Sequence, residues 1–132
     1  MDRKVIGGVI LMGKTSEELL ESIVKAMDGK RAQDIVVLDM KGISIMSDYN
    51  IITHASNSRL INAIADAVVE AGRENGHEVD NIEGKKTGNW LLVDLGSVIV
   101  HIFSQEERSH YQLEGLWSEA KNVDLTDWLV AD

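Results

Sequence analysis

The chain has 132 residues, the size of one domain, because a single core is usually built from roughly 100–200 residues. It contains no cysteine, which excludes disulfides, Cys-ligated zinc and thiol catalysis. Lys and Arg number 13 against 22 Asp and Glu, so the net charge is −9. Such a chain is repelled by phosphate backbones, and we expect a basic protein partner with little direct nucleic-acid contact.

The first residues resemble the front of a signal peptide but lack its remaining features. Arg3 and Lys4 precede an apolar run that ends at Met12, yet no small-residue cleavage pattern follows. The run is far shorter than the roughly 20 apolar residues that span a bilayer. We therefore expect a cytoplasmic chain without membrane contact. Residues 1–12 are interpreted as an N-terminal extension or tail, with Met12 as a second candidate start of translation.

The first half of the chain predicts two helices around two strands. Thr15 or Ser16 caps a helix, Glu18 completes a capping box, and apolar residues recur at helical spacing as far as Met27. Short apolar, β-branched runs at 35–38 and 49–53 predict strands covered on both faces. A second helix begins at Asn57 or Ser58 and ends before Gly76.

The second half predicts mostly strands. A weak strand is expected around Val79 and Ile82, and residues 90–95 and 98–103 predict a hairpin whose turn is Gly96-Ser97. Short helical pieces follow at 106–111 and 113–117, and Asp124 to Trp128 is expected to pack loosely or not at all. The order α-β-β-α-β-β-β-α predicts an α/β layered fold. We expect one domain at 13–119, with a mixed sheet of about five strands and flanking helices, and a C-terminal tail at 120–132.

One motif predicts a nucleotide site. Residues 8–15 fit G-x-x-x-x-G-K-[ST], in which backbone N–H groups hold phosphates, Lys14 contacts the terminal ones and Thr15 binds magnesium. Only seven residues precede Gly8, leaving little room for an anchoring strand, and the four middle residues are bulky and apolar. A nucleotide-binding enzyme that uses Gly8 to Thr15 is therefore kept as an alternative.

Other catalytic and metal-binding patterns are weak. Leu95-Gly96-Ser97 resembles the turn of nucleotidyltransferases, but no Asp has an acidic residue two positions later, so a D-x-[DE] magnesium pair is missing. The four histidines form no H-x-x-x-H pair, and no G-x-S-x-G serine nucleophile is present. Asp39 and Asp94 suit turns better than a shared metal. Trp90 opens a strand, where core packing and a binding hot spot both explain it.

Three groups of segments, in order, resemble the signatures of one known family. They are Asp39, 47–52, 56–59 and 64–66; then 83–84 and 89–103; then Arg108, Tyr111, 113–114 and 116–117. Over about residues 15–128 the chain is similar to the ribosomal silencing factor (RsfS, or Iojap) family. The resemblance implies a nucleotidyltransferase-like fold without catalytic carboxylates, and neither enzymatic activity, cofactor nor metal.

The resemblance also implies a function. Members bind the large ribosomal subunit through its protein number fourteen, block joining of the small subunit and repress translation when nutrients are short. A large-subunit assembly factor is kept as a further alternative, and an exposed sheet edge would permit homodimerisation.

Site residues follow from the same resemblance. Trp90 matches the tryptophan implicated in the ribosomal-protein contact. The further candidates are its neighbours Asn89, Leu91, Asp94 and His101, the preceding Lys85 and Lys86, and the family-motif residues Ser58 and Arg59. A helix cap explains Ser58 equally well. Ala55 replaces a frequent Gly, and Asn89 and Ser97 each replace a usual Asp, which changes the charge near this interface.

Overall fold

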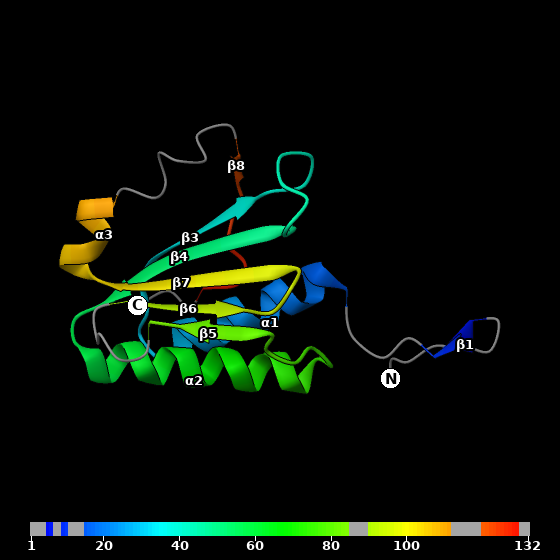
Figure 1. The fold of residues 1–132 in the computed structure, drawn as a ribbon, viewed down its shortest axis with the longest axis horizontal. Coiled ribbons are helices and arrows are strands. Elements are labelled where there is room, and N and C mark those ends of the chain that lie inside the picture. The colour runs from blue at the N-terminus through cyan, green and yellow to red at the C-terminus, as the bar shows by residue number, and fades with distance from the viewer. Residues whose placement is uncertain (1–4, 7–8, 11–14, 85–89, 112–119, 130–132) are drawn as a thin grey trace.

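A computed structural model of the chain describes residues 5–6, 9–10, 15–84, 90–111 and 120–129 (Figure 1). The elements, in chain order, are β1 (Val5–Ile6), β2 (Val9–Ile10), α1 (Ser16–Gly29), β3 (Gln33–Asp39), β4 (Tyr49–Ala55), α2 (Ser58–Glu74), β5 (Asn81–Glu83), β6 (Trp90–Asp94), β7 (Val98–Ser104), α3 (Gln105–Tyr111) and β8 (Lys121–Asn122). None of the helices within these residues is long and apolar enough to cross a membrane.

One six-stranded sheet, in the order β5-β6-β7-β4-β3-β8, organises the fold. β4 and β7 are parallel and every other neighbouring pair is antiparallel, which confirms the predicted mixed α/β sheet. The sheet has six strands where about five were expected, and the additional one is Lys121–Asn122, which we placed in a tail and which pairs with the end of β3. β1 and β2 pair only with each other, as a separate two-stranded sheet.

Local side-chain hydrogen bonds start both long helices. The Thr15 hydroxyl accepts from the backbone N–H of Glu18, whose carboxylate accepts from the N–H of Thr15, so the predicted capping box is present. In α2 the cap is Asn57, whose side-chain oxygen accepts from the N–H of Leu60 at 2.9 Å. Ser58 is therefore the first residue of the helix and not its cap.

The two faces of the sheet differ in what covers them. α1 and α2 pack side by side on one face, where they bury the larger core with inward residues of β4, β6 and β7 (Figure 1). The opposite face holds a smaller cluster of Leu38, Met40, Ile52 and Phe103, flanked by Trp90. Successive residues of a strand point to opposite faces, so β3, β4, β6 and β7 each place residues at both clusters.

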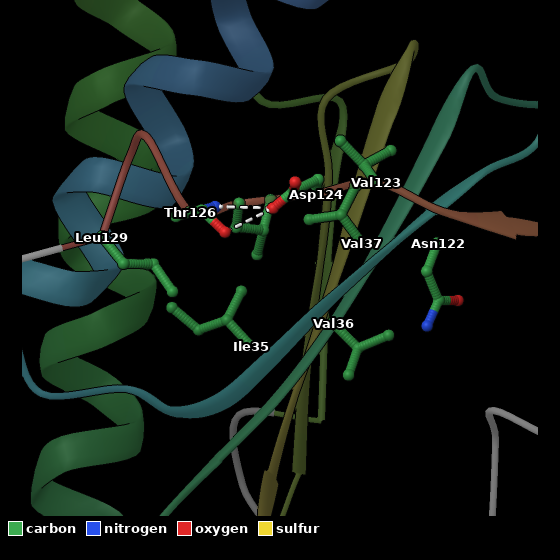
Figure 2. A pocket seen from close by; sticks show the side chains of 9 residues that line it. Ile35, Val36, Val37, Asn122, Val123, Asp124, Thr126 and Leu129 are labelled. Carbon is green, nitrogen blue, oxygen red and sulfur yellow. Dashed lines mark hydrogen bonds between the residues drawn. The ribbon is translucent and has the colours of Figure 1, made fainter.

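The C-terminal segment is part of the core, and the expectation that Asp124 to Trp128 packs loosely is wrong. Val123 donates its N–H to the carbonyl of Val37 at 2.9 Å, Leu125 is 7% exposed, and Trp128 packs against the helix-covered core. A groove of about 290 Å³ remains between this segment and β3, with Leu129 at its rim (Figure 2). The segment was missed because its strand has only two residues and its hydrogen bonds join distant parts of the chain.

Because the C-terminal segment packs on the core, we expect it to contribute measurably to the free energy of unfolding. Leu125→Ala removes a buried side chain, and we expect it to lower the free energy of unfolding by about 2–3 kcal/mol. Leu129→Ala truncates a side chain that is 38% exposed, and should cost less than about 1 kcal/mol. Urea unfolding of both variants measures the difference. Equal, small effects would show that the C-terminal segment contributes little.

Candidate protein-binding face

Alternation along β6 and β7 brings five partly exposed side chains, and that of the buried Phe103, to the sheet face opposite α1 and α2. Leu92 pairs with His101, and Asp94 pairs with Ile99, while Trp90 pairs with the buried Phe103. Directly opposed side chains in an antiparallel pair lie about 5 Å apart, so they form one continuous surface. Each is partly exposed to solvent. The name docking face is used below for Trp90, Leu92, Asp94, Ile99 and His101.

The edge strand β5 adds polar groups beside the docking face. Glu83 pairs with Leu92, and Asn81 pairs with Asp94. Both β5 residues are exposed, and the Asn81 amide donates to the Glu83 carboxylate at 2.7 Å. An apolar centre is thus bordered by the carboxylates of Glu83 and Asp94.

Trp90 is held from two sides. Its ring lies 6.4 Å from that of Phe103 at an interplanar angle of 31°. On another side it packs against the backbone of Gly84, where a Cβ would overlap the Trp90 carbonyl oxygen and come within 2.9 Å of ring atom Cζ3. Gly84 also has a φ of +88°, a conformation that side chains other than glycine's rarely adopt. The sequence therefore needs glycine here to seat the indole.

His101 lies at the centre of the face and is uncharged at neutral pH. Its ring stacks on that of Phe103, with centroids 6.3 Å apart and an interplanar angle of 3°. Burial lowers the pKa of His101 from 6.5 to about 4, because the charged imidazolium loses hydration. The core of the docking face therefore carries no formal charge at pH 7.

Asp39 and Asp94 take part in turns, as the sequence predicts. The Asp94 carboxylate accepts from the N–H of Gly96 at 2.8 Å, and Gly96 has a φ of +86° in the turn between β6 and β7. The Asp39 carboxylate accepts from the N–H of Lys41 at 3.0 Å, and this bond, with the nearby ammonium, lowers the Asp39 pKa. Among the described residues, no group of three or more His, Asp or Glu side chains is placed to hold a metal ion.

The structure brings together only part of the predicted site. Trp90, Asp94 and His101 share the docking face, but Leu91 is 2% exposed and packs in the helix-covered core, so it cannot contact a partner. Leu92 and Ile99, which the sequence analysis did not select, occupy the face instead. Alternation from Trp90 could have found Leu92, since residues two apart share a face.

The remaining candidates lie elsewhere. Ser58 and Arg59 are exposed in the first turn of α2, in the helix layer, and the Ser58 carbonyl accepts from the Asn62 amide at 2.8 Å. Lys85, Lys86 and Asn89 lie outside the described residues.

The contact between Gly84 and Trp90 predicts a specific response to Gly84→Ala. The added methyl group should displace the indole and cost about 1–3 kcal/mol in backbone strain. We expect the Nε1–H NMR resonance of Trp90 to shift while that of Trp128 stays in place. Gly29→Ala is the control, because nothing lies within 4 Å of its Cβ position. An unchanged Trp90 resonance would contradict the proposed seating of the ring.

Burial of His101 predicts a loss of stability in acid. The folded protein resists protonation down to about pH 4, whereas an unfolded histidine takes up its proton near pH 6.5. Stability from this group is therefore complete above pH 6.5 and falls as the pH drops towards 4. When the pH falls from 7.5 to 5, the free energy of unfolding of His101→Gln should decrease by about 2 kcal/mol less than that of the wild type. Denaturant unfolding at the two pH values checks this, and parallel losses would contradict it.

Comparisons with known proteins agree on one family. The family model described as "Ribosomal silencing factor during starvation" (RsfS) matches residues 13–132. The chain is 44% identical over 109 residues to a ribosomal silencing factor RsfS of Bacillus subtilis, covering 83% of this chain and 92% of that protein. It is 40% identical over 111 residues to the RsfS of Halalkalibacterium halodurans, covering 84% and 95%. A crystal structure of a Bacillus halodurans protein superposes with a TM-score of 0.73 at 40% identity, covering 83% of this chain and 99% of that one. The chain belongs to the ribosomal silencing factor RsfS family.

Proposed function

We propose that this chain binds the large ribosomal subunit through the docking face, with the basic ribosomal protein number fourteen as its direct partner. Family membership supports the ribosome as the target. The observation that carries the site is the position of Trp90, a partly exposed tryptophan fixed between Phe103 and Gly84 at one end of an apolar strip. Tryptophan is enriched at hot spots, and a pre-positioned ring loses little entropy on binding.

The charge distribution supports a basic partner. The net charge is −9, and the carboxylates of Glu83 and Asp94 border an uncharged centre. An apolar centre with a charged rim is the usual arrangement of a protein–protein interface. The acidic rim steers a basic protein into place, while the surrounding RNA repels the same chain.

The proposed mechanism is steric exclusion. A domain bound where the small subunit docks occupies space that the small subunit needs, so joining is blocked and translation is repressed when nutrients are short. Affinity and position suffice, and the mechanism requires neither catalysis nor a cofactor. The site of action is the cytoplasm.

Two alternatives make different predictions. A large-subunit assembly factor would bind large subunits without inhibiting their joining. A nucleotide-binding enzyme would use the segment from Gly8 to Thr15; the structure describes only residues 9–10 and 15 of it, and the Thr15 hydroxyl serves there as the cap of α1. Titration with Mg-ATP tests the enzyme, and a subunit-joining assay tests the assembly factor.

The proposed site predicts a selective binding defect. Trp90→Ala should weaken binding to purified large subunits by about 2 kcal/mol or more, roughly 30-fold in Kd, if the indole is a hot spot. Trp128→Ala is the matched control, because Trp128 is also a partly buried tryptophan but packs with the opposite, helix-covered core. Co-sedimentation of both variants, with melting temperatures recorded, separates binding from stability.

The Trp128→Ala control also shows which results would contradict the proposed binding site. Equal weakening by the two tryptophan variants would indicate a loss of folding rather than of a contact. Unchanged binding of Trp90→Ala would remove the docking face as the site. In the joining assay, wild-type protein should lower the yield of joined ribosomes, and Trp90→Ala should restore it.

A further inference from the structure

The loop between β3 and β4 exposes three large apolar side chains within four residues. Ile43 is 45% exposed, Met46 is 76% exposed and Ile45 is 102% exposed. Single exposed apolar residues are common on soluble proteins, whereas several together mark an interaction site. These residues are called the apolar tip below. Within the described part of the chain, the other exposed large apolar residues, Ile82 and Leu129, are isolated.

The loop has a well-bonded base. The carbonyl of Met40 accepts the N–H groups of Ile43 and Ser44, and Met40 donates its own N–H to Asp48. The Lys41 ammonium lies 3.9 Å above the ring of Tyr49, is 2.7 Å from its hydroxyl oxygen, and pairs with Asp39 at 3.3 Å. The tip therefore extends from a backbone that is already ordered, which lowers the entropy lost on binding.

The base of the loop that carries the tip is hydrogen-bonded to the turn that follows the docking face. Asp48 and Tyr49 both donate their N–H groups to the carbonyl of Ser97, in the turn between β6 and β7. This turn directly follows Asp94, and Ile99 pairs with Asn50 of β4. The loop thus lies at the same end of the sheet as Asp94 and Ile99 (Figure 1).

A standard protein–protein interface is wider than β6 is long. Trp90 and Asp94 mark the two ends of β6, about 13 Å apart. A standard interface covers about 800 Å² on each protein, roughly 30 Å across. An interface of that size therefore extends beyond the Asp94 end of β6, towards the turn beside which the tip loop lies.

We propose that the apolar tip is a second anchor of the docking face and inserts into an apolar depression on the same basic protein. This inference rests on the proposed function. Charge favours this occupant over the others, because nucleic acid, anionic lipid and a second copy of the −9 chain all carry charge of the same sign as this chain. A basic protein is attracted by the same charge, and its apolar surface offers the tip a place out of water.

Replacement of the two most exposed tip residues tests the inference. Ile45→Ser combined with Met46→Ser should weaken binding of the full chain to purified large subunits about tenfold or more. The melting temperature should stay within about 2 °C, since neither side chain is in the core. Leu129→Ser is the control, because it removes an exposed leucine at the groove beside β3 and should bind as the wild type does.

Each outcome distinguishes the tip from the docking face. Wild-type affinity of the tip variant, with weak binding of Trp90→Ala, overturns the second anchor and leaves the proposed function standing. No binding of wild-type protein to large subunits overturns both. Sedimentation velocity and flotation with phosphatidylglycerol vesicles accompany the assay. If the tip variant loses self-association or vesicle binding but keeps its affinity for subunits, the partner is a second copy or a lipid surface and the inference is wrong.

Discussion

The parallel pairing of β4 with β7 is the constraint on which the rest of the structure depends. Every residue of β4 is buried, so the strand must have neighbours on both edges and cover on both faces. β3 supplies one neighbour directly, and β7 supplies the other after the chain has passed through α2, β5 and β6. Parallel strands need such a long connection. This long connection places α2 over one face of the sheet. It also places β6, which carries Trp90, at the edge of β7 that is not paired with β4.

The sequence predicted the positions of helices and strands better than it predicted which residues of a strand face the helices. Both long helices begin at residues whose caps depend on neighbours three positions away, so local sequence suffices. The segment Trp90-Leu91-Leu92-Val93 is apolar throughout, so its composition does not show which alternate residues face the helices. Only packing of Leu91 beneath α2 decides that Leu92 faces the other way. For that reason the sequence did not show that Leu91 is buried, or that Leu92 and Ile99 share the outer face with Trp90, Asp94 and His101.

Long-range hydrogen bonds account for the other features that the sequence did not reveal. The Arg108 guanidinium, from the seven-residue α3, donates to the carbonyl of Asp34 at 2.6 Å and lies 3.0 Å from Nδ1 of His54. Asp34 has a φ of +46° in an irregular stretch of β3, where the pairing register with β4 shifts between Gln33 and Val36. A helix this short has little stability of its own, so these contacts of Arg108 hold α3 against the sheet. The family resemblance marks Arg108, but its partner is 74 residues away.

In the proposed complex, charge and apolar contact would have separate roles on the docking face. Long-range attraction between an acidic chain and a basic protein raises the rate of encounter, but salt at physiological strength screens it beyond about 8 Å. Persistence of the proposed complex would then depend on groups that lose water, and on this face the uncharged ones are Trp90, Leu92, Ile99 and a neutral His101. An imidazolium at the centre would meet a basic partner with like charge. The lowered pKa of His101 beside Phe103 keeps that charge away at pH 7, so the same packing would keep the outer face suitable for the proposed basic partner.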